Sequence, residues 1–346
     1  SFAKELYVSG LGGRENVSRI NSVDFSVIQA TESTDRSYSA LRPITVDEKF
    51  IYGGDHYNNR IVKISKSSMT SSVFVSTFGS FGSGTTTFNV IYQMAVDDGF
   101  LYVCDFGNNR VKVHDKNNLK FVNAFGTLGN GATSFHNPSG VAVDDTNLFV
   151  ANDGNYSISK LNKTTGKYID SVDLNLSNIG DTTLAVDDRY LYAMHQIVAP
   201  SDITYSDIQL EKRNKSDLKL INKVLIRPET APNYISSYTI TGDLGITDDY
   251  IYVSFTDDAN IIQGGNFFIQ KRLKSDFSLV KEYKSKTLQF AIAGNGLSWR
   301  AKRQNIVRDL ESEGTYIQIK YSDNELDNSM KLYNQSLLVI LIPAKE

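Results

Sequence analysis

The chain has 346 residues, of which 40% are apolar and 11% aromatic, enough for a sizeable buried core. Its 36 basic and 39 acidic side chains give a formal net charge of −3. This balance disfavours a nucleic-acid binder, because phosphate recognition needs a basic surface. The single cysteine, Cys104, excludes an intrachain disulfide. The longest apolar run, Leu337–Ile342, is far shorter than the roughly 20 residues of a membrane-spanning helix, so we expect no membrane insertion.

One pattern recurs along the chain: a small apolar strand, an acidic turn and an aromatic strand. A half copy lies at residues 5–8, and full copies lie at residues 44–52, 94–103, 141–150, 184–193 and 244–253. The intervals between equivalent residues are 45, 50, 47, 43 and 60, which suits one four-stranded blade per repeat. No long segment has a helical apolar stripe, so the sequence predicts an all-β propeller of four-stranded antiparallel blades.

Each part of the repeat has a physical reason. The first strand carries small or β-branched residues such as Ala95 and Val96, because innermost strands crowd towards a narrow channel. The acidic pair then forms a tight turn, where aspartate can accept hydrogen bonds from its own backbone. The aromatic strand supplies the apolar area that packs one blade against the next.

The loops after the aromatic strands resemble the NHL repeat family. Residues 54–64 and 104–113 share an Asp before Asn-Asn-Arg and a strand, and the linkers at 125–141 and 78–88 are also similar to NHL connections. The resemblance implies a propeller in which the repeated aspartates and arginines are scaffold residues, namely Asp55, Asp105, Asp153, Arg60 and Arg110. Ser157 stands where the third such loop should have an arginine, and later loops carry longer insertions.

Ring closure can be interpreted in two ways. Residues 288–293 can pair with the N-terminal half copy, which gives six blades over residues 1–296 and a small C-terminal β module over 297–346. Alternatively, residues 288–335 form a seventh blade, and Leu337–Leu341 closes the ring. We expect six blades.

Long loops on a rigid scaffold are where binding usually occurs. We therefore expect a protein or glycan partner to meet one loop face of the propeller through aromatic, histidine and acidic side chains. The candidates are His56, Tyr57, Phe106, His136, Tyr156, Tyr205, Tyr234, Asp257 and Asp258.

Metal binding and catalysis have less support in the sequence. His56, His136 and His195 are expected in loops on one face, but no repeat offers a second matching ligand for zinc. Asp257, Asp258 and Asn260 are oxygen ligands without the EF-hand spacing. No nucleophile elbow or phosphate-binding glycine loop is found, and Cys104 is expected to be buried and inert. We predict no cofactor and no metal.

The favoured interpretation is a non-enzymatic binding or assembly protein, attached to something larger through its C-terminal module. The alternatives are a metal-dependent propeller lyase or lactonase, and an RNA-binding NHL protein, which the charge balance disfavours. The N-terminus shows no charged and apolar leader. Together with the absence of disulfides, the composition suggests a virion or extracellular surface protein rather than a cytoplasmic one.

Overall fold

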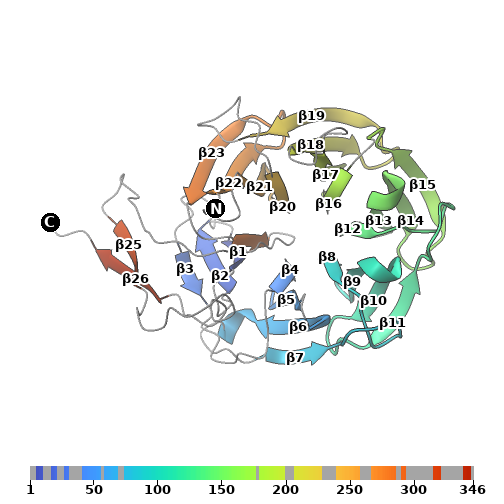
Figure 1. Cartoon of the computed structure of the whole chain (residues 1–346), viewed down its shortest axis with the longest axis horizontal. Coiled ribbons are helices and arrows are strands. Elements are labelled where there is room, and N and C mark those ends of the chain that lie inside the picture. Colours follow the sequence, from blue (N-terminus) through green and yellow to red (C-terminus); the bar gives the residue numbers. More distant parts are fainter. Residues whose placement is uncertain are drawn as a thin grey trace, which may run out of the picture.

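The computed structural model describes residues 5–10, 17–21, 27–30, 41–55, 58–68, 74–176, 179–198, 206–227, 239–257, 266–285, 290–293, 315–320 and 338–343. Figure 1 shows these segments as sheets arranged in a ring around a central axis, with one small sheet to the side. The prediction of an all-β propeller with four-stranded antiparallel blades is confirmed. No helix in the described part is long and apolar enough to cross a bilayer.

Five blades each use four consecutive strands. Blade 1 contains β4 (Leu41–Val46), β5 (Phe50–Asp55), β6 (Arg60–Ser65) and β7 (Phe74–Phe78). Blade 2 contains β8 (Ile91–Val96), β9 (Phe100–Asp105), β10 (Arg110–Asp115) and β11 (Phe121–Phe125). Blade 3 contains β12 (Pro138–Val143), β13 (Asn147–Asn152), β14 (Ser157–Asn162) and β15 (Tyr168–Asp173). Blade 4 contains β16 (Ile179–Val186), β17 (Tyr190–Val198), β18 (Ser206–Asn214) and β19 (Leu220–Ile226). Blade 5 contains β20 (Thr239–Ile246), β21 (Tyr250–Asp257), β22 (Asn266–Leu273) and β23 (Leu279–Ser285).

The remaining strands form one composite sheet and one small sheet. β24 (Phe290–Ala293) pairs with β1 (Glu5–Gly10), which continues to β2 (Val17–Asn21) and β3 (Val27–Ala30). β25 (Thr315–Lys320) pairs with β26 (Leu338–Pro343) beside the ring (Figure 1). Among the described residues, five blades therefore use consecutive strands. The pairing of β24 with β1 is the one that the six-blade interpretation predicts for residues 288–293, whereas β26 pairs with β25, so the seven-blade alternative is wrong.

The antiparallel order gives the ring two different ends. At the turn end lie the turns between first and second strands and between third and fourth strands. At the loop end lie the loops between second and third strands and the linkers between blades. Short 3-10 turns occur at both ends: η1 (Lys66–Ser68) at the turn end, and η2 (Phe106–Asn108) and η3 (Asp153–Asn155) at the loop end.

The core lies between blades rather than within them. One fully buried cluster joins Tyr52 and Ile61 of blade 1 to Met94 and Leu101 of blade 2. Equivalent clusters join each later pair of consecutive blades. Because each blade buries its apolar area against its neighbours, the ring is stabilised as a whole.

Gln93 links three inner strands at the centre. This buried β8 side chain accepts hydrogen bonds from the backbone N–H groups of Val141 and Leu184, both at 2.9 Å. Its amide donates to the carbonyl oxygen of Leu184 at 2.8 Å. One side chain thus satisfies buried backbone groups of β12 and β16, which would be costly to leave unpaired.

An aspartate at the turn end joins each of blades 1 to 4 to the following blade. Asp97 accepts hydrogen bonds from the backbone N–H groups of Gly99 (2.9 Å) and Phe100 (2.7 Å) and from the Tyr102 hydroxyl (3.1 Å). It also binds the ammonium group of Lys163, from the following blade, at 2.7 Å. The expected self-capping of the acidic turn is confirmed, whereas the lysine from the next blade was not predicted.

The same inter-blade ion pair occurs four times among the described residues. The further pairs are Lys116 with Asp47 (3.2 Å), Lys215 with Asp144 (3.1 Å) and Lys274 with Asp187 (2.7 Å). A second contact links the same blades: a lysine on the third strand of one blade donates hydrogen bonds to backbone carbonyl oxygens in the turn of the next blade. Lys63 reaches the Lys116 and Asn117 oxygens at 2.8 and 3.0 Å, and Lys160 reaches those of Lys215 and Ser216 at 3.0 and 3.1 Å.

These aspartates make stability depend on pH. Burial raises the pKa of Asp97, but the hydrogen bonds from Lys163, Gly99 and Phe100 outweigh it, so the pKa lies below the ordinary 3.8. A lowered folded-state pKa contributes stability that is present above 3.8 and is lost as pH falls through the folded value. The pKa values of Asp47, Asp144 and Asp187 are lowered in the same way.

We predict that Asp97→Asn lowers the free energy of unfolding by about 2–3 kcal/mol at neutral pH, because it weakens hydrogen bonds to a charged acceptor. Urea denaturation at a series of pH values measures the effect, and the difference from wild type should shrink in strong acid. Asp98→Asn is the matched control: Asp98 is the exposed neighbour, and its substitution should change stability by less than about 0.5 kcal/mol. Equal effects of the two substitutions would contradict the role assigned to Asp97.

Candidate functional site

The loop between second and third strands in blade 2 is organised by a buried aspartate. Asp105 is fully buried and accepts hydrogen bonds from Asn108 Nδ2 at 2.9 Å and from Arg110 Nε at 2.8 Å. It also accepts a bond from the backbone N–H of Asn89 in the preceding linker, at 2.7 Å. In blade 1, Asp55 has the equivalent bonds from Asn58 and Arg60.

Blade 3 has a different residue at this position. Asp105 ends β9, and the residue that ends β13 is Asn152, so Asp153 is equivalent to Phe106. The prediction that Asp153 repeats Asp55 and Asp105 is therefore wrong by one residue. Asp153 is nine-tenths buried, and burial, followed by the nearby charge of Asp181, raises its pKa well above the ordinary value.

Two linkers at the loop end have the same fold. Residues 79–90 lead into blade 2 and residues 126–137 into blade 3. Each has a parallel bridge, Phe81 with Phe88 in the first and Leu128 with Phe135 in the second. Their second glycines have φ of 148° and 156°, and each glycine's carbonyl oxygen accepts a bond from the loop asparagine at 2.9 or 3.0 Å. Gly84, Thr85 and Thr87 are therefore equivalent to Gly131, Ala132 and Ser134.

In blade 2, two cationic side chains bind the inner side of the linker. Arg110 Nη2 donates to the Gly84 carbonyl oxygen at 2.8 Å. Lys112 Nζ donates to the carbonyl oxygens of Thr85 (2.7 Å) and Thr87 (3.1 Å). Lys112 is fully buried, and burial lowers its pKa to about 8 although the charge of Asp105 opposes the shift.

In blade 3, the same space is a cleft. Strand register makes Ser157 equivalent to Arg110 and Ser159 equivalent to Lys112. The shorter side chains leave a cavity of about 460 Å³. It is lined by Asn130, Gly131, Ala132, Ser134, Asn152, Gly154, Asn155, Tyr156, Ser157, Ser159, Ser171 and Asp173. The volume is within the range of about 300–1,000 Å³ that small-molecule sites occupy.

The cleft is lined mainly by hydrogen-bond acceptors and hydroxyls. Asn152 donates to Ser159 Oγ at 3.1 Å, while its buried Oδ1 has no partner within the described residues. Asp173 is exposed and is the one carboxylate among the lining residues, which include no lysine or arginine. The unpaired Asn152 oxygen and the Asp173 carboxylate are therefore acceptors that a hydrogen-bond donor of a ligand could use.

Tyr156 lines the cleft in a strained conformation. Its φ of 50° lies in the left-handed region, where blades 1 and 2 have Asn59 and Asn109. Asparagine tolerates this region far better than a bulky aromatic residue, for which such strain costs on the order of 1–3 kcal/mol. Strain of this kind often accompanies function, and Tyr156 was among the predicted partner-binding residues.

The other predicted site residues do not lie together at this cleft. Phe106 stacks on Tyr92, with ring centroids 4.2 Å apart, and His136 packs over Gly154 beside the cleft. Asp257 ends β21. His56, Tyr57, Tyr205, Tyr234, Asp258 and Asn260 lie outside the described residues.

His195 was expected in a loop, but it is buried within β17. Its Nδ1 lies 3.1 Å from Thr182 Oγ1, and its Nε2 lies 3.5 Å from a Glu211 carboxylate oxygen. A three-histidine site on the loop face is therefore not formed by this residue. Among the described residues, no group of three or more His, Cys, Asp or Glu could hold a metal ion. Cys104 is buried, and burial, followed by the charges of Asp153 and Asp105, raises its pKa well above the ordinary value.

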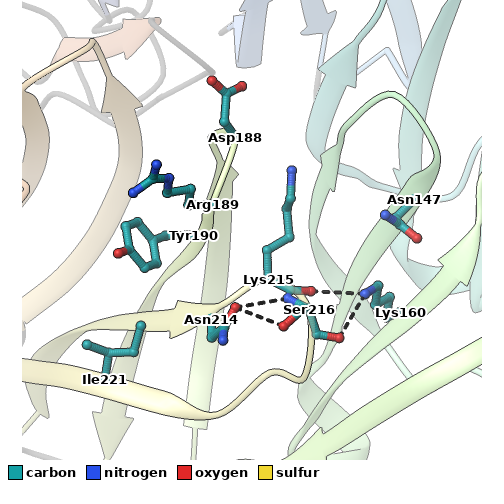
Figure 2. Close-up of a pocket in the computed structure, with 9 residues that line it drawn as sticks. All are labelled: Asn147, Lys160, Asp188, Arg189, Tyr190, Asn214, Lys215, Ser216 and Ile221. Atoms are coloured by element: carbon teal, nitrogen blue, oxygen red, sulfur yellow. Dashed lines mark hydrogen bonds between the residues drawn. The ribbon is translucent and has the colours of Figure 1, made fainter.

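A second cavity of about 560 Å³ lies at the turn end between blades 3 and 4 (Figure 2). Part of its polar lining is already engaged in hydrogen bonds between the two blades and within blade 4. Lys160 donates to the backbone of Lys215 and Ser216, and Asn214 accepts bonds from the Ser216 N–H and hydroxyl (Figure 2). We therefore take the blade 3 cleft as the candidate site.

No protein-family model matches the chain, and no curated protein matches it. Among solved structures, a nidogen/laminin complex is similar over 80% of this chain and 93% of its own, with a TM-score of 0.52 and 12% identity. Kuenenia stuttgartiensis hydrazine synthase is similar over 74% and 70%, with a TM-score of 0.46 and 13% identity. The dihydro-heme d1 dehydrogenase NirN in complex with DHE is similar over 97% of this chain and 61% of its own, less than two thirds, with a TM-score of 0.46 and 12% identity. The likeness shows the β-propeller fold alone.

The equivalence of the two blades predicts a specific energetic coupling. Asn152→Asp alone places an unpaired carboxylate in a buried position and should destabilise the protein by about 3 kcal/mol or more at neutral pH. Adding Ser157→Arg should recover about 1.5–3 kcal/mol, because it restores the pair seen at Asp105 and Arg110. A double-mutant cycle by urea denaturation measures the coupling, and strictly additive effects would contradict the equivalence.

Proposed function

We propose that this chain is a non-enzymatic binding protein that presents the loop end of its propeller to a protein partner. The observation that carries the proposal is the blade 3 cleft, where the cationic side chains of blade 2 are replaced and acceptor groups are left open. Loops on a rigid scaffold are frequent binding sites, and this cleft is built from a loop and a linker.

Exposed apolar side chains on the two equivalent linkers support the proposal. Phe81 is 70% exposed and Leu128 67%, the largest values among the exposed large apolar side chains of the described residues. Both lie at the bridge that shapes the linker, and Leu128 is two residues from the cleft-lining Asn130. An apolar side chain beside a polar cleft is typical of a protein interface.

We also infer an NHL-like ancestry from the Asp-x-x-Asn-Asn-Arg loops at residues 55–60 and 105–110. We infer that the C-terminal module, which contains β25 and β26, attaches the ring to a larger assembly at a virion or cell surface. One of the similar structures is a nidogen/laminin complex. A glycan remains the alternative ligand class.

A photo-cross-linking residue placed at Leu128 should capture the partner from an extract of the source material. The same residue placed at Lys219, whose side chain is 81% exposed at the turn end, is the control for the opposite end. Leu128→Asp should weaken binding of the captured partner about tenfold, as expected for a contact worth more than 1 kcal/mol. Capture only from Lys219, or binding that Leu128→Asp leaves unchanged, would contradict the proposal.

A further inference from the structure

We propose that the blade 3 cleft is a socket for an arginine or lysine side chain of the protein partner. In blade 2 the chain's own Arg110 and Lys112 occupy the equivalent space, and in blade 3 the partner supplies the cation. The inference rests on the proposed function for the identity of the partner, but the chemistry of the cleft can be tested without it.

Blade 2 serves as an internal template for the occupied site. Its three linker carbonyl oxygens, from Gly84, Thr85 and Thr87, all accept hydrogen bonds from a guanidinium or ammonium group. Lys112 Nζ also lies 4.0 Å from the centroid of the Phe88 ring. The linker therefore binds cations through carbonyl oxygens and one aromatic face.

Blade 3 lacks the cations and keeps two of the three carbonyl acceptors open, whereas the third, the Gly131 oxygen, accepts a bond from the Ser134 N–H at 2.9 Å. The linker around Gly131, Ala132 and Ser134 has the same bridge, glycine conformation and asparagine anchor as its counterpart. In the described part of the chain, no protein donor reaches the carbonyl oxygens of Ala132 and Ser134. Phe135 is equivalent to Phe88 but is fully buried and does not line the cleft, so the carbonyl oxygens carry the argument in blade 3.

The loss of the cation is matched by the loss of the buried anion. Where Arg110 becomes Ser157, Asp105 becomes Asn152, so the carboxylate that needs the arginine in blade 2 is absent at the equivalent position of blade 3. The blade can therefore fold without a ligand, and a cation can bind reversibly. The charge that attracts it is at the exposed rim, on Asp173.

The chemistry favours arginine or lysine over a sugar. A guanidinium has five N–H donors and no acceptor, which suits a site of carbonyl, amide and carboxylate oxygens. A sugar hydroxyl has to accept as well as donate hydrogen bonds. The serine hydroxyls and asparagine amides of the lining can donate to it, but a neutral sugar makes no use of the charge of Asp173, which favours a cation.

The test uses N-acetyl-arginine amide as the probe and N-acetyl-citrulline amide as its neutral counterpart of the same shape. Titration of the ¹⁵N-labelled full chain, followed by NMR, should show saturable shifts of the Gly131, Ala132, Gly154 and Tyr156 amides with arginine. Citrulline should bind at least about tenfold more weakly, because it lacks the charge.

The variant Asn152→Asp/Ser157→Arg fills the cleft with the pair found in blade 2 and should abolish the arginine shifts. The matched control, Asn117→Asp/Thr164→Arg, makes the same charge changes at exposed positions of the turn end and should leave them intact. Equal binding of arginine and citrulline, shifts that persist in the filled variant, or saturable binding of methyl glucoside in place of arginine would overturn the inference.

The failure of this inference can be told apart from failure of the proposed function. If arginine does not bind but partner cross-links at Leu128 persist, the loop end binds a partner without this socket. If arginine binds at the cleft but cross-links arise only at Lys219, the socket stands and the proposed protein-binding role of the loop end falls.

Discussion

The ring depends on contacts between neighbouring blades, because no blade buries its apolar area alone. The carboxylates at the turn end make the most direct of these contacts. Asp97 fixes its own turn through two backbone bonds and holds the next blade through Lys163, so local geometry and ring geometry share one side chain. Gln93 does the equivalent work at the centre, where it joins β8 to β12 and β16. With the neighbours held in this way, the loop end can vary.

Blades 2 and 3 show how such variation produces a cavity. The linkers into the two blades have the same fold, and the loops keep the same asparagine anchor. Three of the differences between them open the cleft: Asn152 replaces Asp105, Ser157 replaces Arg110 and Ser159 replaces Lys112. Because the anion and its cation disappear together, the change leaves a cleft instead of a buried charge. The repeated blades thus form the scaffold, and comparison of blade 3 with blade 2 identifies the open site.

Much of the fold could be predicted because the repeated sequence pattern determines the strands and turns of each blade. The alternation around residues 94–103 and 141–150 gives the strand pairs, and the acidic turns cap themselves as expected. The inter-blade lysines were missed, although similar turns recur at residues 115–120, 162–167 and 214–219. A salt bridge between blades joins residues up to 87 positions apart, so no local spacing rule reveals it.

The site was predicted only in part. The missing arginine at Ser157 and the aromatic Tyr156 were visible in the sequence, but the register error at Asp153 hid the coupled change at Asn152. His195 was mispredicted for a different reason: strand β17 continues beyond the repeat, so His195 is buried in a strand instead of lying in a loop. Whether a side chain lines a cavity depends on the linker from the preceding blade, which the sequence of the loop itself does not contain.

The most direct measurement is a crystal structure of the full chain soaked with N-acetyl-arginine amide. The account predicts a planar guanidinium in the blade 3 cleft, within hydrogen-bond distance of the carbonyl oxygens of Ala132 or Ser134 and near Asp173. The equivalent space in blade 2 should hold Arg110 and Lys112 as before. A cleft that contains only water at saturating probe, with arginine bound elsewhere, would contradict it.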